Sequence, residues 1–378
     1  MNGSTQPNLP TVSAASRLLS LDAYRGMVMF ARFARGFSLA KVATHYPDSE
    51  LMQWLKFNTS HPQWNSQFKL IGFSLWDMIQ PAFMFMVGVS MPYSYEKRKQ
   101  LGHSYQQRLA HAWTRAGMLI LLGVFLQSMR KPETNWMFTN VLSQIGLGYG
   151  FLFFLVGQRF RTQLITVAVV LLGYFLLTTP WGFENGNSLP QRFDLWLLNL
   201  FPRETEFTGH DYATLNFVPS FVTMLLGLMS GQLLKNGELE KEQKLKRLIL
   251  GGAVCLLLAI AWAPLCPIVK KLWTPSWALF SGAYVIWFLA LLYWLIDCRG
   301  WQLGWTTFFV VVGMNSIAAY FMGQLMKPFA RGVFHTHLPN SFWEATGVWE
   351  PFFESVFVAA LFWLLLFWLY RNRVFIRI

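Results

Sequence analysis

The sequence predicts an all-α polytopic membrane protein in which about ten transmembrane helices form one bundle. Of its 378 residues, 54% are hydrophobic and 13% are charged, whereas soluble proteins usually carry about 25% charged residues. Apolar stretches of roughly 18 residues or more recur along the whole chain, and a helix of that length can cross the hydrocarbon core. Because the basic residues gather between these stretches, we attribute the net charge of +13 to orientation in the membrane and expect no nucleic-acid partner.

The order of the spans follows from apolar length and from the polar loops between them. We place them at residues 23–44, 73–95, 109–129, 138–157, 164–179, 213–234, 248–265, 277–296, 306–326 and 351–370. The first 18 residues are polar and rich in Ser, Pro and Asn, which predicts a disordered N-terminal tail. Residues 19–378 are predicted to form a single transmembrane domain surrounded by membrane lipids.

The basic loops define an orientation. Each short basic loop follows an even-numbered span, as at residues 97–99 and 241–247, so the positive-inside rule predicts that both termini are cytoplasmic. Lys270 and Lys271 break this rule, as do Arg192, Arg203 and Arg331, because they fall in loops predicted to face outward. Three of the outer loops are longer than usual, which favours a functional role for that side.

The stretch around His61 and Asp77 is the predicted centre of the chemistry. His61 stands in a polar setting, and an imidazole that titrates near pH 7 can act as a base or a nucleophile. Asp77 stands at the entrance to an apolar span, where a carboxylate is costly unless it is paired. The alternatives are an exposed loop histidine and a helix-start residue favoured by the helix dipole.

Several motifs, taken in order, resemble those of the heparan-α-glucosaminide N-acetyltransferase family of membrane acyltransferases. SLDAYRG at residues 20–26 is similar to an SLDxxRG motif, and WDMIQPAFMFMVG at residues 76–88 is similar to a DLxFPxFxFxxG motif. His61, Trp64 and Asn65 resemble the family's histidine and WNG elements. Further matches lie at residues 141–149, 215–219, 273–277 and 313–316, the last three being most like a bacterial branch.

This resemblance implies an acetyltransferase. It implies that acetyl moves from cytosolic acetyl-CoA to an amino sugar or related glycan beyond the membrane, with His61 in the active site. For a bacterial relative it implies the inner membrane, and it allows a homodimer. Ser66 follows Asn65 where the family has glycine, and the family's asparagine at the end of span one has no counterpart near residues 35–36. These departures leave the acceptor open.

Given that reaction, some basic residues are candidates for binding the phosphates of coenzyme A. Arg25 lies near the predicted cytoplasmic end of span one, and Arg108 and Arg115 are seven residues apart, so they share a helix face. The alternatives are a pair between Arg25 and Asp22, and ordinary positive-inside charge for the other two. Arg32 and Arg35, also in span one, receive no assigned role.

Polar amides and aromatic residues complete the predicted site. We assign the side chains of Asn140 and Gln144 to the donor, although such amides also hydrogen-bond between helices. The residues assigned to the acceptor are Trp64, Asn65, Asn216, Trp273 and Asn315. Tryptophans are also common at any membrane interface.

Other functions remain compatible with the residues alone. We expect no metal, because His335 and His337 supply only two ligands. The runner-up function is a transporter or flippase for a sugar or a lipid-linked sugar, in which the intramembrane Arg and Asp residues would bind substrate or protons.

Overall fold

The structure, a computed structural model, describes residues 18–61, 71–129, 131–184, 186, 188–302 and 304–376. These residues are almost entirely helical. The helices are α1 (Leu19–Ala34), α2 (Leu39–Val42), α3 (Glu50–Asn58), α4 (Ile79–Gln100), α5 (Tyr105–Ser128), α6 (Val141–Phe153), α7 (Phe160–Thr178), α8 (Leu189–Leu197), α9 (Phe217–Lys235), α10 (Lys241–Trp262), α11 (Pro275–Leu292), α12 (Gly304–Met314), α13 (Ser316–Phe321), α14 (Lys327–His337), α15 (Asn340–Thr346) and α16 (Glu350–Arg371). Two short strands, β1 (Ile71–Gly72) and β2 (Ile268–Val269), pair in parallel.

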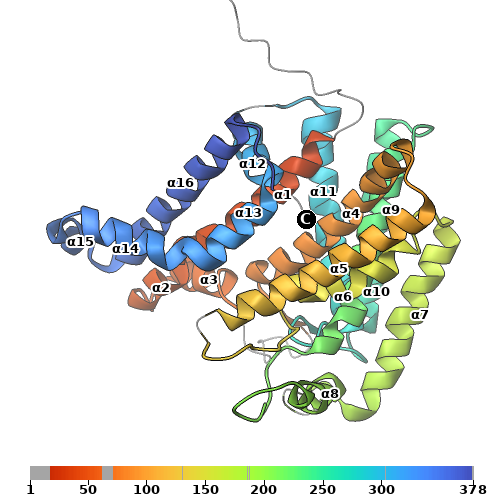
Figure 1. Cartoon of the computed structure of the whole chain (residues 1–378), viewed down its shortest axis with the longest axis horizontal. Coiled ribbons are helices and arrows are strands. Elements are labelled where there is room, and N and C mark those ends of the chain that lie inside the picture. Colours follow the sequence, from red (N-terminus) through yellow and green to blue (C-terminus); the bar gives the residue numbers. More distant parts are fainter. Residues whose placement is uncertain are drawn as a thin grey trace, which may run out of the picture.

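The helices form a bundle in which α4 contacts α1, α9 and α11, and α11 also contacts α1 and α9, while α7 and the α14–α16 region flank opposite sides (Figure 1). α4 and α9 approach so closely that a Cβ on Gly88 would lie 1.9 Å from the carbonyl oxygen of Met224. A Cβ on Gly227 would likewise lie 2.1 Å from that of Phe85. Small residues that allow such contact are typical of helix packing in membranes.

The predicted class is confirmed, but the number of full-length spans is lower than the sequence suggested. Six helical stretches of the described chain are long and apolar enough to cross a membrane. A seventh span results if α12 and the helix that follows it, which are bent by 79° at Asn315, are counted as one. The helices that fall short include α1, which has 16 residues, and α6, which has 13. α4 has 22 residues but carries three basic residues in its last turn.

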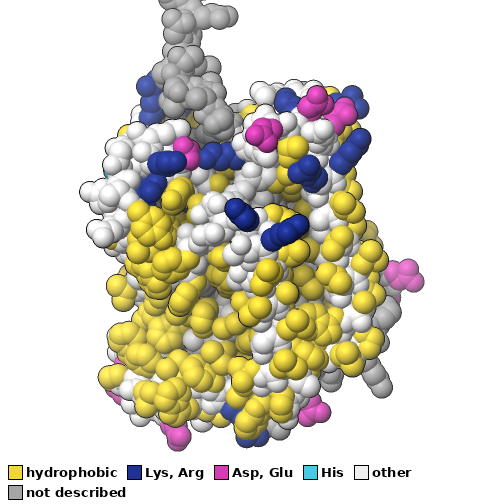
Figure 2. Space-filling view, turned by 90° about the vertical axis from the view of Figure 1, so that its right-hand side faces the viewer, with side chains coloured by type: hydrophobic (Ala, Val, Ile, Leu, Met, Phe, Trp, Pro, Cys, Tyr) yellow, Lys and Arg dark blue, Asp and Glu magenta, His cyan; other side chains and the backbone are white. Residues whose placement is uncertain are grey.

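The outer surface of the bundle fits a lipid environment. Large hydrophobic side chains are exposed along α5, α7 and α10, for example Leu121, Val169 and Leu257. Figure 2 shows a broad hydrophobic band on one face, with Lys and Arg concentrated toward one end of it. The chain is therefore a multi-pass integral membrane protein.

Candidate functional site

His61 and Asp77 form a close pair. His61 lies just after α3, and Asp77 lies in the 3₁₀ turn Leu75–Met78 that leads into α4. The Nδ1 atom of His61 is 2.5 Å from Oδ1 of Asp77. The histidine side chain is 48% exposed, whereas that of the aspartate is only 2% exposed. Within the described residues no hydrogen bond is made by Nε2 of His61, so Nδ1 is the ring nitrogen that Asp77 holds.

The backbone around the pair is held by Ser74. Its N–H donates to Oδ2 of Asp77 at 3.1 Å, and its hydroxyl donates to the carbonyl of Ser60 at 2.6 Å. Since Ser60 precedes His61, this one serine ties the histidine segment to the aspartate turn. The local sequence explains the turn, because a serine followed three residues later by an acidic residue is a common helix-start pattern.

A third charged residue, Lys270, completes the cluster. Its Nζ is 3.4 Å from Oδ1 of Asp77, and it donates a 2.9 Å hydrogen bond to the hydroxyl of Tyr212. The lysine side chain is 6% exposed. Sequence reasoning did not assign it to the site. The signal that could have drawn attention to it was its violation of the positive-inside rule.

The parallel strands explain why these distant segments meet. Ile71 pairs with Ile268 and Gly72 with Val269, so Lys270 follows β2 beside the turn that carries Asp77. A tight turn then returns the chain toward α11, with Trp273 N–H bonded to the Lys270 carbonyl at 2.9 Å. Trp273 is 1% exposed and has a φ of 46°, an uncommon conformation for a bulky residue that the surrounding packing must hold in place.

The end of α1 borders the same site. Four consecutive residues, Arg35–Ser38, have positive φ and end the helix. A Cβ on Gly36 would lie 3.0 Å from the Cβ of Thr59 and 3.5 Å from the ring of Trp76, so this segment packs beside both halves of the pair. Arg35 itself is exposed.

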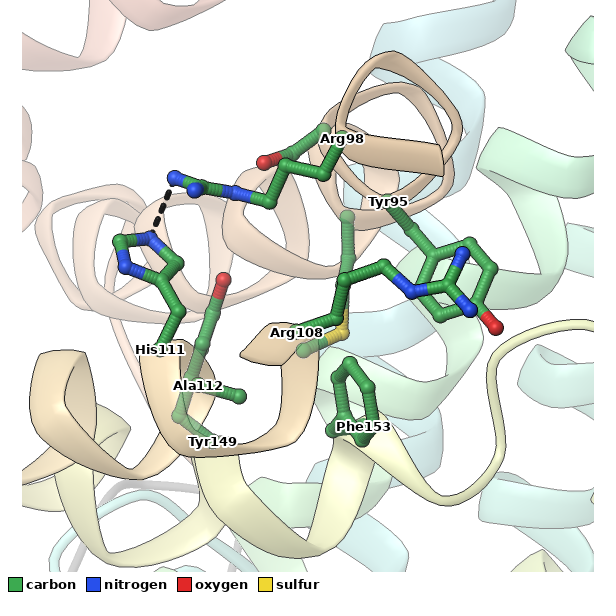
Figure 3. A pocket seen from close by; sticks show the side chains of 9 residues that line it. Tyr95, Arg98, Arg108, His111, Ala112, Tyr149 and Phe153 are labelled. Carbon is green, nitrogen blue, oxygen red and sulfur yellow. Dashed lines mark hydrogen bonds between the residues drawn. The ribbon is translucent and has the colours of Figure 1, made fainter. Parts of the chain in front are cut away.

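A basic pocket lies at the opposite end of α4, where it meets α5 and α6 (Figure 3). Arg108 stacks on the ring of Tyr95 at 4.4 Å, and its buried Nε and Nη1 atoms have no hydrogen-bond partner among the described residues. Arg98 hydrogen-bonds His111 across the pocket. Arg115 lies next to this pocket, where it donates to the hydroxyl of Tyr149 at 3.2 Å. Such half-buried guanidinium groups are suited to bind phosphate.

The other residues predicted to bind the donor lie elsewhere. Arg25 pairs with Asp22 at 3.4 Å and does not line the pocket. Asn140 caps the start of α6, accepting from Ser143 N–H at 3.0 Å. Gln144 is buried and donates to the Thr214 carbonyl at 3.1 Å. Both amides thus lie at the end of α6 away from the basic pocket.

The predicted acceptor residues are also dispersed. Asn216 is buried and donates to the carbonyl of Lys271 at 2.7 Å, which places it one residue from Lys270. Trp273, being buried, has little ring surface free. Asn315 is bonded to the segment after α16, through the Val374 carbonyl and the Ile376 N–H. Trp64 and Asn65 lie outside the described residues.

A second buried carboxylate is hydrogen-bonded to a residue close to Tyr212 in the sequence. Asp194 of α8 is 2% exposed and accepts from Thr214 N–H at 2.8 Å. Burial raises the pKa of this carboxyl to about 6, against the opposing effect of the Thr214 hydrogen bonds. Within the described chain, no group of three His, Cys, Asp or Glu side chains could hold a metal ion.

The fold and site together define a polytopic membrane protein with an acid–base pair at one end of its bundle and a basic pocket at the other. The family model for the catalytic region of heparan-alpha-glucosaminide N-acetyltransferase matches residues 17–265, about two thirds of the chain. The chain therefore belongs to this family of membrane N-acetyltransferases, which confirms the resemblance seen in its motifs. A comparison with curated proteins gives no match. The matched region contains His61 and Asp77 but ends before Lys270.

Proposed function

We propose that this protein transfers the acetyl group of cytosolic acetyl-CoA to the amine of an amino sugar or related glycan on the other side of the membrane. The observation that carries the proposal is the 2.5 Å contact between His61 and a nearly inaccessible Asp77. A carboxylate on Nδ1 fixes the imidazole and leaves Nε2 free to take a proton or an acyl group.

The basic pocket supports a donor site at the cytoplasmic end. Tyr95, which lines it, follows Asp77 by 18 residues along the turn and α4, a rise of about 27 Å at 1.5 Å per residue. That length is close to the roughly 30 Å of the hydrocarbon core. Phosphates bound near Arg98 and Arg108 would leave the thioester arm to extend along α4 toward His61.

The transfer itself needs a base. In a direct route, the acceptor nitrogen forms a bond to the thioester carbonyl carbon while Nε2 of His61 takes the amine proton. The carbon–sulfur bond then breaks, and the proton passes to the departing thiolate of coenzyme A. In a two-step route, Nε2 first bonds to the carbonyl carbon, the carbon–sulfur bond breaks, and coenzyme A leaves as its thiolate. The amine then attacks the acetyl-imidazolium carbonyl, the bond from carbon to Nε2 breaks, and the amine proton passes to the freed Nε2. Both routes need an unprotonated Nε2.

The proposed acceptor side is the end of the bundle that carries His61. Both termini then face the cytoplasm, as the basic loops suggest, and for a bacterial cell the membrane is the inner one. The long segment between α7 and α9 contributes Tyr212 and Asp194 near the cluster, and its polar side chains suit a hydroxyl-rich acceptor.

The test is acetyl transfer by purified protein in detergent, with radiolabelled acetyl-CoA and glucosamine as the trial acceptor. Wild type and His45→Ala should release coenzyme A and acetylate the sugar, since His45 is exposed and lies outside the pair. His61→Ala should lose at least ~10²-fold in rate, a typical loss for a general base. Normal turnover by His61→Ala would rule out its catalytic role, and label retained on wild type alone would favour the two-step route.

A further inference from the structure

Lys270 is a buried cation, and a buried cation is costly unless a partner offsets the loss of water. Lys270 as a whole is 5% exposed. Among the described residues, the acid it contacts is Asp77, and a second polar partner is the hydroxyl of Tyr212, whose ring centroid lies 4.6 Å from Nζ. The position of this ammonium group is therefore tied to the same carboxylate oxygen that holds His61.

The backbone fixes which of two neighbouring lysines points inward. The register of β1 with β2 brings Lys270 to Asp77. Lys271 lies in the turn closed by Trp273 and has a different partner. Lys271 contacts Asp211 at 2.5 Å, and the Asp211 side chain is 48% exposed. The chain thus offers two adjacent lysines of equal charge, one inside the cluster and one outside it.

The charges around Asp77 are complementary. Oδ1 receives both the imidazole Nδ1 and the Lys270 ammonium, and Oδ2 receives the Ser74 N–H. A fixed positive charge beside the carboxylate favours its anionic form. An anionic carboxylate in turn favours the imidazole tautomer that carries its proton on Nδ1.

We propose that Lys270 is a positioning residue for acetyl transfer, whose ammonium group, held by Tyr212, keeps Asp77 anionic and aimed at Nδ1 of His61 so that Nε2 faces the acceptor. This inference rests on the proposed function. It assigns a role to a residue that lies beyond the region matched by the family.

The first experiment compares Lys270→Met, Lys270→Arg and Lys271→Met in the acetyl-CoA and glucosamine assay. Lys270→Met should lower kcat by about 10–100-fold, the usual loss for a residue that orients another. The KM for acetyl-CoA should stay within about twofold, because the donor pocket lies some 27 Å away along α4. Lys270→Arg should restore most of kcat, and Lys271→Met should behave as wild type.

The pH profile separates positioning from packing. Within the described residues, Asp77 contacts His61 directly, Lys270 contacts Asp77, and Tyr212 contacts Lys270. Removing the ammonium charge favours the protonated imidazole, so the midpoint of the rise in kcat should move to higher pH by about one unit. Lys271→Met should leave that midpoint in place.

A second readout does not depend on turnover. Diethyl pyrocarbonate modifies the neutral imidazole, and its rate at His61, followed by peptide mass spectrometry against pH, should show the same upward shift in Lys270→Met. If wild type transfers no acetyl but this shift appears, the proposed function fails while the electrostatic link stands. If folded, monodisperse Lys270→Met keeps wild-type kcat and both midpoints, the inference is overturned. The inference would also be overturned if Lys270→Met lowers kcat but shifts neither midpoint and Lys270→Arg restores no activity, because that is the behaviour of a packing residue.

Discussion

Replacing Asp77 by asparagine should lower the rate of acetyl transfer by about 10³-fold, equivalent to ~4 kcal/mol of transition-state stabilisation. The geometry supplies the reason. Asparagine keeps one oxygen, but Asp77 uses one oxygen for the Ser74 N–H and the other for both His61 and Lys270. If the amide oxygen stays on Ser74, the NH₂ group faces the ammonium of Lys270 and makes Nδ1 of His61 an acceptor, which moves the ring proton to Nε2. If the amide is flipped, two N–H donors meet at Ser74.

The assay for this prediction is single-turnover release of coenzyme A from radiolabelled acetyl-CoA by wild type, Asp77→Asn and Asp211→Asn. Asp211 pairs with Lys271, the neighbour of Lys270, so Asp211→Asn makes the same chemical change outside the cluster. It should lower the rate by less than about threefold. Thermal melting in detergent checks that both variants are folded. A folded Asp77→Asn protein that keeps a third or more of the wild-type rate would refute the reasoning.

Three further results are expected. Arg108→Gln should weaken binding of free coenzyme A by about tenfold, since a charge-assisted hydrogen bond contributes ~1.5–3 kcal/mol. Arg161→Gln, on the exposed start of α7, is the control and should bind coenzyme A as wild type does. Equal dissociation constants for Arg108→Gln and wild type would remove Arg108 from the donor site. Asp194→Asn should stabilise the protein increasingly between pH 4 and pH 6. The carboxyl has a pKa of about 6 in the folded protein and ~3.9 in the unfolded chain, so between these pH values the native protein binds the extra proton. The stability of wild type therefore falls as pH rises through that window, by up to ~3 kcal/mol. A difference in melting temperature between Asp194→Asn and wild type that does not vary with pH would contradict this. Gly227→Ala should destabilise the bundle, because its Cβ would meet the Phe85 backbone. Gly173→Ala, with open space around it, should be neutral or stabilising by up to ~1 kcal/mol. Equal melting temperatures of the two variants would contradict the close contact between α4 and α9.

The sequence was a good guide to the class of fold because a transmembrane helix leaves a long apolar signature of its own. It was less good on the number of full-length spans. Apolar length alone could not show that α1 ends at the left-handed residues Arg35–Ser38, or that the chain bends by 79° at Asn315. Those breaks depend on packing against other helices, which a count of apolar residues does not detect.

The candidate site was predictable only where its chemistry is local. Asp77 stands out as an acid at the start of an apolar run, and the family motifs contain His61 and Asp77 together. Lys270 does not stand out in this way, because β1 and β2 pair residues that are far apart in the sequence. Its sign in the sequence was a positive charge in a loop that we predicted to face outward. Asn140, which we assigned to the donor, caps the start of α6 in the structure, a role that its sequence context also allows.

α4 links the two ends of the proposed reaction. Asp77 lies just before its first residue, and Arg98 lies in its last turn at the basic pocket. α4 is in turn fixed by backbone contact with α9 at Gly88 and Gly227, where no side chain can adjust. A shift of α4 along its axis would move the Asp77 carboxylate and Arg98 by the same amount. The distance between Asp77 and Arg98 is therefore set by one helix, whereas the contact of Asp77 with His61 and Lys270 depends on how that helix is held against the rest of the bundle.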